Sequence, residues 1–357
     1  SHTGAHLAEL MSHVVEEWQL LDKDVVLVTD NAANMIAAAQ CGTFPHVKCF
    51  AHTVNLASQR ALKVAALSRL LARIRRISSF FHCSATANHC LKVKQQCLGL
   101  KNHKLITDVA TRWNSAYDMV ERFLKQQPAI CATLLSPEVR KGEADLCTLT
   151  ETDVINAEDA VKALKPMKDV TTLMSEEHNP TVSLIAPLNA QLIQNMSYSP
   201  RDSHMIHEIK NAIKADLLKR YNSESEKRIL HTASALDPRF KGLPFLKEEE
   251  RLEVYKARTE EAASLEVINL SCFLYNIKNG LLGQSFADPD ESIVERKTPC
   301  AIAKEEIDAY CKAPSLSLTE DPLYWWHVHE IMFPLLQLSK RYLCIPGTSV
   351  SAERVFS

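Results

Sequence analysis

The sequence predicts a mainly helical protein with a small α/β part. Glycine is scarce, at 8 of 357 residues, and this favours helices because glycine destabilises a helix interior. Long stretches repeat apolar residues at the i, i+3, i+4, i+7 spacing of one helix face. Residues 25–28 are instead apolar and rich in valine without alternation, which is typical of a short buried strand. A second short strand is predicted over residues 47–50.

These elements predict an α-β-α-β-α order in the first sixty residues. A helix over residues 5–21 repeats apolar side chains on one face. The first strand ends in Thr29 and Asp30. Asn31 is then expected to cap a helix that runs through Ala39 and stops at Gly42. The second strand leads directly into a helix from about His52.

After residue 60 the pattern is almost wholly helical. One apolar face is formed by Leu67, Leu70, Leu71, Ile74 and Ile77. Further helices are expected near residues 112–135, 151–175, 182–196, 204–221 and 248–262, with loops near 136–150, 197–203, 222–227 and 284–300. Residues 321–343 predict a dense aromatic and apolar helix, bent at Pro334 because proline cannot continue the helical hydrogen bonds.

Composition excludes several classes of protein. The net charge is −2, so any nucleic-acid binding must use a local basic patch. The 11 cysteines are an odd number without a Cys-x-x-Cys pair, which indicates a reducing compartment, the cytosol or the nucleus. No apolar run approaches the length of about 20 residues that a membrane helix needs.

Four segments carry a resemblance to a known family. They are Val-Thr-Asp-Asn-Ala-Ala-Asn-Met at 28–35, Cys-Phe-Ala-His-Thr-Val-Asn-Leu at 49–56, Thr-Arg-Trp-Asn-Ser at 111–115, and a tail from Asp-Pro-Leu-Tyr-Trp-Trp at 321–326 to Ser-Ala-Glu-Arg-Val-Phe-Ser at 351–357. In this order the chain resembles the hAT transposases over its whole length, and among them the domesticated proteins with a BED zinc finger.

The resemblance implies an incomplete RNase H-like core split by a large helical insertion. Residues 1–60 would form part of the core, residues 61–320 the insertion, and residues 321–357 the hAT dimerisation region with the start of the last core helix. The first strands, the first catalytic acid and the BED finger are expected upstream of residue 1. The chain is therefore expected to be a fragment, truncated at both ends.

The family holds two divalent metal ions, Mg²⁺ or Mn²⁺, on three acids. Asp30 matches the second acid and Glu353 the third, so both are candidate catalytic and metal-binding residues. Carboxylates are suitable ligands because two-metal phosphoryl transfer needs hard oxygen donors. The residues alone allow a second interpretation, in which Asp30 starts a turn or caps a helix and Glu353 complements a helix dipole. Zinc is expected only in the BED finger.

Cys49 and His52 have the spacing of half a zinc site, but no second half follows at zinc-finger spacing. We therefore expect Cys49 to pack in a strand and His52 to lie near the crevice, in contact with a phosphate. Cysteines also recur every seven residues at Cys83, Cys90 and Cys97, which predicts a core seam along one helix.

Several residues are candidates for DNA contact. In the family a tryptophan of the insertion stacks where a base is flipped, and Trp113 beside Arg112 resembles it. The alternative is a partly buried tryptophan at a helix start. Basic residues also line one helix face, and another lies near the end of the chain. They would contact phosphates or form a solvated surface: Arg69, Arg73, Arg76 and Arg354.

The tail predicts self-association, since an apolar helix is buried in a core or in a subunit interface. The residues expected at the interface are Tyr324, Trp325, Trp326, Ile331, Met332, Leu335 and Leu336.

The prediction for function is a transposase-derived nuclear protein that binds DNA, regulates transcription and forms a homodimer or higher homo-oligomer. It would act without a membrane or a small-molecule substrate, and without catalysis by this chain, because the first acid is not in it. Two alternatives remain: a fragment of an active hAT transposase, and, by kinship alone, a regulatory protein of the SUMO-ligase type.

Overall fold

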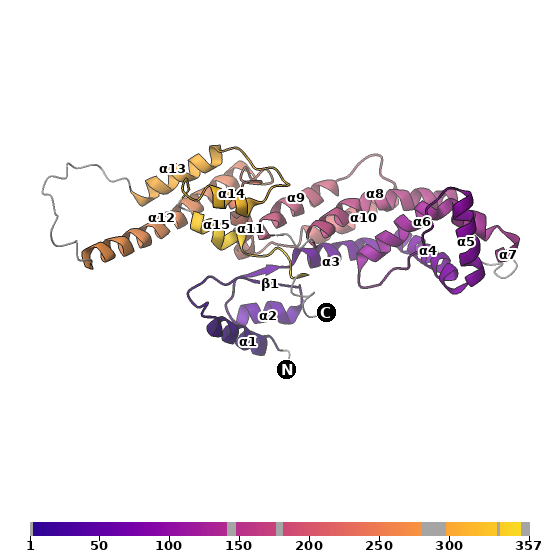
Figure 1. Cartoon of the computed structure of the whole chain (residues 1–357), viewed down its shortest axis with the longest axis horizontal. Coiled ribbons are helices and arrows are strands. Elements are labelled where there is room, and N and C mark those ends of the chain that lie inside the picture. The colour runs from indigo at the N-terminus through magenta and orange to yellow at the C-terminus, as the bar shows by residue number, and fades with distance from the viewer. Residues whose placement is uncertain (1–2, 141–147, 176–180, 280–297, 334–335, 351–357) are drawn as a thin grey trace. The chain divides into compact units, whose positions relative to one another are not determined.

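The computed structural model describes residues 3–140, 148–175, 181–279, 298–333 and 336–350 (Figure 1). Its regular structure within these ranges is helical except for one sheet of two strands, as the sequence predicts. The chain forms two compact units. We call one the sheet unit, formed by Ser1–Cys49, Glu177–Ala190 and Tyr221–Ser357, and the other the helical unit, formed by Phe50–Glu176 and Gln191–Arg220. These boundaries differ from those expected at residues 60 and 320, because the chain returns to the sheet unit twice.

The sheet joins two parallel strands, β1 (Leu27–Thr29) and β2 (His46–Lys48), with Thr29 opposite Lys48. Helices α1 (Gly4–Glu17) and α2 (Ala33–Cys41) pack together, and Gly4 permits their close approach because a Cβ atom there would lie 2.7 Å from Ala37 Cβ. Two predictions are corrected. Strand β1 is only half-buried, and Phe50 already begins a helix.

The cap expected at Asn31 is also wrong. Ala32 occupies the N-cap position of α2, and no side chain there caps the helix. Gly42 ends α2 as predicted.

The rest of the sheet unit is built from helices that the sequence predicts only in part. They are the 3₁₀ turn η1 (Val182–Leu184), α11 (Glu224–Leu236), α12 (Glu248–Asn279), α13 (Pro299–Lys312), α14 (Pro322–Val328) and α15 (Leu336–Leu343). Figure 1 shows α12 and α13 side by side. Helix α9 (Ile185–Asn195) leads out of this unit.

The prediction of a single bent helix over residues 321–343 is wrong. Helix α14 ends at Val328, with His329 at its C-cap, well before Pro334. The expected loop at 222–227 is also wrong in part, because Ser223 caps α11 by accepting a hydrogen bond from the backbone N–H of Glu226 at 3.2 Å.

The helical unit is a stack of helices around an apolar core. Its elements are α3 (Phe50–Leu62), α4 (Ala65–Cys83), α5 (Ala85–Cys97), α6 (Trp113–Leu134), α7 (Pro137–Arg140), α8 (Glu151–Leu173) and α10 (His204–Leu217). The predicted apolar face of α4, from Leu67 to Ile77, is buried and confirmed. No helix in the described residues has both the length and the apolar character to span a bilayer.

The prediction that three cysteines line one buried helix face is wrong. Cys83 and Cys97 are exposed and Cys90 is half-buried. Ser84 ends α4 and caps α5, so the seven-residue spacing runs over two helices and does not mark one face.

Candidate functional site

The first candidate site lies at the carboxyl edge of the sheet. Asp30 directly follows β1, and Cys49 directly follows β2, so both stand at the same edge of a parallel pair. The backbone N–H of Cys49 donates to Thr29 O at 2.7 Å and closes the ladder there. Asp30 is half-buried, and its Oδ1 accepts a hydrogen bond from the Ala32 N–H at 3.2 Å. Asp30 therefore lies at a strand end, as expected for a metal ligand. It also accepts the hydrogen bond expected of an aspartate that starts a turn.

A histidine and a hydroxyl face each other on the two strands. His46 Nε2 lies 2.8 Å from Thr29 Oγ1. Burial lowers the pKa of His46, the neighbouring Glu226 raises it, and Lys48 lowers it further. The net shift is downward, so the folded protein favours the neutral imidazole.

A buried carboxylate from α11 holds the end of β2. Glu226 is almost fully buried, and it accepts hydrogen bonds from the Lys48 backbone N–H at 3.1 Å and from Lys48 Nζ at 3.0 Å. The Tyr221 hydroxyl donates to Lys48 O at 2.9 Å. Sequence reasoning missed Glu226 because it placed the residue in a loop, and 178 positions separate it from Lys48.

The thiol of Cys49 anchors the tail of the chain at this edge. Cys49 Sγ lies 3.3 Å from Thr348 Oγ1 and accepts the Ser349 N–H at 3.3 Å. A second hydrogen bond holds the same segment. The Val182 N–H donates to Ile345 O at 2.9 Å. Cys49 is buried as expected, but it follows the strand and contacts the tail. Glu353 and Arg354 lie outside the described residues.

The acids expected to bind metal are only partly described. Among the described residues, no group of three or more His, Cys, Asp and Glu side chains is placed to hold a metal ion. Asp30 offers one hard carboxylate, and one of its oxygens already accepts a hydrogen bond from the backbone. The other family-equivalent acid, Glu353, is not described. His52 is half-buried in the first turn of α3, in the helical unit.

Trp113 is a core residue of the helical unit. It is 1% exposed, and its ring packs edge-to-face against Tyr117 at 6.2 Å. Its backbone N–H donates to Asn55 Oδ1 at 3.4 Å. The structure thus places Trp113 as the buried helix-start residue of the alternative interpretation, without an exposed ring face on which a base could stack. Arg112 beside it is exposed.

The arginines of α4 do not form one uniform row. Arg73 forms an ion pair with Asp153 and donates to Thr148 O at 3.4 Å. Arg75 forms two hydrogen bonds of 2.6 Å with Asp108, and these hold the pKa of that carboxyl below its ordinary value. Arg69 and Arg76 are exposed and form no ion pair with any described residue. Only the last two are therefore open to an anionic partner.

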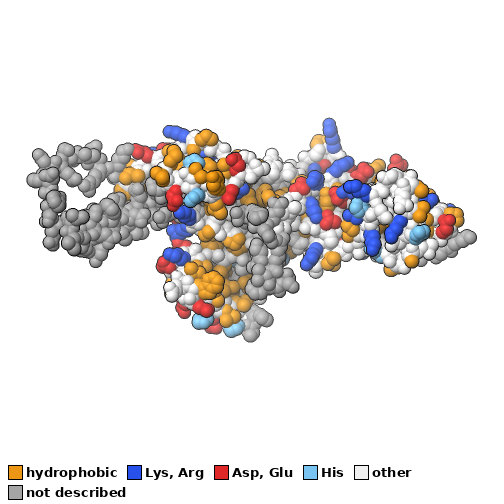
Figure 2. Space-filling model, in the orientation of Figure 1, with side chains coloured by type: hydrophobic (Ala, Val, Ile, Leu, Met, Phe, Trp, Pro, Cys, Tyr) orange, Lys and Arg blue, Asp and Glu red, His pale blue; other side chains and the backbone are white. Residues whose placement is uncertain are grey.

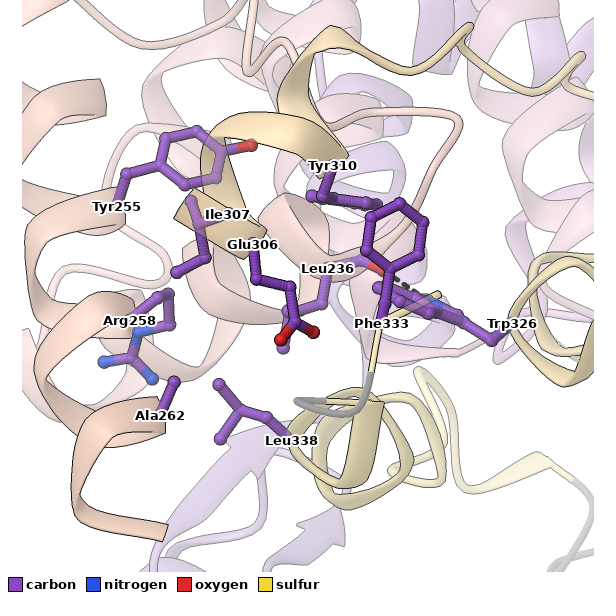
Figure 3. A pocket seen from close by; sticks show the side chains of 10 residues that line it. All are labelled: Leu236, Tyr255, Arg258, Ala262, Glu306, Ile307, Tyr310, Trp326, Phe333 and Leu338. Atoms are coloured by element: carbon purple, nitrogen blue, oxygen red, sulfur yellow. Dashed lines mark hydrogen bonds between the residues drawn. The ribbon is translucent and has the colours of Figure 1, made fainter. Parts of the chain in front are cut away.

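Aromatic side chains at the C-terminal end form a compact cluster in the sheet unit (Figure 3). Tyr310 and Trp326 stack at 5.0 Å. Their polar ends satisfy carbonyls at the end of α11, since Trp326 Nε1 donates to Leu236 O at 2.8 Å and the Tyr310 hydroxyl donates to Ala235 O at 3.1 Å. The cavity beside them measures about 30 Å³, which is room for about two water molecules.

Two of the residues predicted at the subunit interface belong to this cluster instead. Trp326 is 6% exposed and Trp325 is partly buried, so both pack inside the unit. Other apolar side chains point outward: Tyr324 is 68%, Ile331 97% and Met332 68% exposed. Leu335 lies outside the described residues, and Leu336 begins α15.

Comparison with known proteins finds two segments of the chain that match family models. Residues 47–160 match the ZBED1 RNase-like helical domain, and residues 306–357 match the hAT family C-terminal dimerisation region. The human zinc finger BED domain-containing protein 4 is 26% identical over 93% of this chain and 28% of its own length. A Zea mays protein named as an AC transposase is 24% identical over 100% of this chain and 48% of its own length.

A third relative, from Talaromyces stipitatus, is named as the transcriptional regulator tpeD, and it is 22% identical over 100% of this chain and 45% of its own length. The chain thus spans less than half the length of each of these relatives. The two domain matches in this order, with similarity along the whole chain, show that the protein resembles the hAT transposases and the BED zinc-finger proteins related to them.

Proposed function

We propose that this protein is a transposase-derived regulator that binds DNA in the nucleus and acts as a dimer through its C-terminal region. The dimer rests on one observation. The region that matches the hAT dimerisation region carries an apolar surface that the fold leaves uncovered. The names of the relatives, a transposase and a transcriptional regulator, support the DNA-binding and nuclear parts of the proposal. In this proposal the sheet unit is the RNase H-like core, and the helical unit is its insertion.

The dimer face comprises Tyr324, Val328, Ile331 and Met332. Tyr324 and Val328 are one turn apart on α14, and Ile331 and Met332 follow in the turn after the helix. All four are more than half exposed, while the opposite side of α14 packs into the aromatic cluster. Four exposed apolar side chains within nine residues favour a protein interface at this position. A second copy offers the same surface, so a two-fold dimer would cover both faces at once.

Sedimentation equilibrium of the Ile331→Ser/Met332→Ser variant tests the dimer. We expect the wild-type chain to sediment as a dimer and the variant as a monomer with an unchanged urea midpoint, since both side chains are exposed. The matched control is Leu318→Ser, an equally exposed apolar residue outside the dimer face, and it should remain dimeric. A variant that sediments like the wild type would remove this face from the proposal.

We further propose that this chain does not cleave DNA and that Asp30 serves as a turn residue. The hydrogen bond from the Ala32 N–H to Asp30 Oδ1 supports this role. The test is incubation of the chain with Mg²⁺ or Mn²⁺ and a labelled DNA end that can form a hairpin. Cleavage by the wild type that is lost in Asp30→Asn would overturn the proposal and favour a transposase.

A further inference from the structure

The charge of this chain is unevenly distributed along the sequence. The whole chain has 41 Lys and Arg residues against 43 Asp and Glu residues. Residues 50–117, by contrast, contain 11 Lys and Arg residues and one acid, Asp108. This segment forms α3, α4, α5 and the first turn of α6, all within the helical unit. This segment is therefore strongly basic in a chain with almost no net charge.

Few of these basic residues are neutralised. Asp108 is engaged by Arg75, and acids from elsewhere in the helical unit pair with Arg60 and Arg73. The remaining basic residues form no ion pair with any residue that the structure describes: Lys63, Arg69, Arg76, Lys92, Lys94, Lys101, Lys104 and Arg112. Figure 2 shows Lys and Arg side chains standing out from the surface of the helical unit.

Four of the unpaired lysines lie on α5 and on the segment that follows it. We call the three exposed ones, Lys92, Lys101 and Lys104, the basic face. Three backbone carbonyls hold the segment in place: Gln95 Nε2 donates to His103 O at 2.9 Å, Arg122 Nη1 to Lys104 O at 3.1 Å, and Gln126 Nε2 to Lys101 O at 3.3 Å. The backbone that carries Lys101 and Lys104 is therefore held in place before a partner arrives, which lowers the entropic cost of binding.

We infer that the basic face binds the phosphate backbone of duplex DNA. This inference rests on the proposed DNA-binding function and assigns it a surface. Exposed lysines that form no ion pair provide the electrostatic footprint that phosphate contacts require. Residues 82–112 contain no Phe, Tyr or Trp. Proteins that hold single strands stack bases on aromatic side chains, so this surface suits a duplex. Binding through it is independent of base sequence.

Salt dependence of binding tests the basic face directly. Three phosphate contacts predict that the logarithm of the association constant falls with the logarithm of salt concentration at a slope of about −3. In the 357-residue chain, Lys92→Gln/Lys101→Gln/Lys104→Gln should flatten this slope by about 3, equally for two duplexes of unrelated sequence. The three residues are exposed, so the variant should keep its urea midpoint.

A matched variant removes the same charge elsewhere on the helical unit. Lys125, Lys162 and Lys165 are exposed, and each pairs with an acid on its own helix. Lys125→Gln/Lys162→Gln/Lys165→Gln should therefore keep the wild-type slope. A basic-face variant that keeps that slope would overturn the inference while DNA binding and the dimer stand. A wild type that binds no duplex would overturn both DNA assignments, and sedimentation would still decide the dimer.

Discussion

The thiol of Cys49 lies 3.3 Å from the hydroxyl of Thr348, across 299 positions of sequence. It also accepts the backbone N–H of Ser349. This contact brings the last described residues of the chain to the carboxyl edge of the sheet, where Asp30 stands. The Cys-x-x-His motif thus contributes its cysteine as an anchor for the C-terminal segment. Four positions separate Ser349 from the family-equivalent acid Glu353.

Replacement of Cys49 by alanine should release this segment. The change removes the acceptor of the Ser349 N–H and the thiol–hydroxyl contact, and lost buried hydrogen bonds cost about 1 kcal/mol each. We expect faster hydrogen exchange at Ser349 and Val350, together with a lower free energy of unfolding. Cys41→Ala is the control, because Cys41 is exposed in the same unit. Equal exchange in both variants would contradict the anchoring role.

Trp113 should contribute to stability and leave DNA binding unaffected. Truncation to alanine opens a cavity in the core and should cost about 3–5 kcal/mol. Trp113→Phe should cost less, because the buried indole N–H has no acceptor among the described residues and its removal relieves an unsatisfied donor. Urea unfolding measures both. A loss of DNA affinity in a folded Trp113→Phe variant would revive the base-stacking role.

Stability should fall as the pH is lowered below about 6.5, the ordinary pKa of histidine. Burial lowers the pKa of both His46 and His231 in the folded state. Below pH 6.5 the unfolded chain therefore takes up protons that the folded protein resists, and the balance shifts toward unfolding. Urea midpoints at pH 7.5 and 5.5 measure the effect. The His46→Gln/His231→Gln variant should show a smaller decrease, and an identical decrease would refute the assignment.

Asp108→Asn should strengthen DNA binding. Asp108 is the single acid of residues 50–117, and its removal frees the guanidinium of Arg75. One additional phosphate contact would steepen the salt slope by about 1. The free energy of unfolding should also fall, because the Asp108 side chain is only 7% exposed and accepts two hydrogen bonds from Arg75. Asp159→Asn, which frees Lys162 on α8, is the control and should leave the slope unchanged.

Local features of the chain were predictable because they depend on near neighbours. The apolar face of α4, the helix end at Gly42 and the α/β order of the first sixty residues follow from spacing and capping residues. The boundaries of the tail were not predictable in this way. Residues 321–343 are apolar on more than one side, so the pattern did not show where one helix ends or which side is covered.

The sequence by itself determined the resemblance to hAT transposases and the helical class, because motif order and apolar periodicity depend only on positions along the chain. Only the tertiary structure decided how Asp30, Cys49, Glu226 and Thr348 share one sheet edge, and that Trp113 and Trp326 are core residues. These relationships depend on long-range packing and on which polar groups find partners when buried. The same packing leaves Ile331 exposed, and hydrogen bonds from Gln95 and Arg122 hold the backbone next to Lys104.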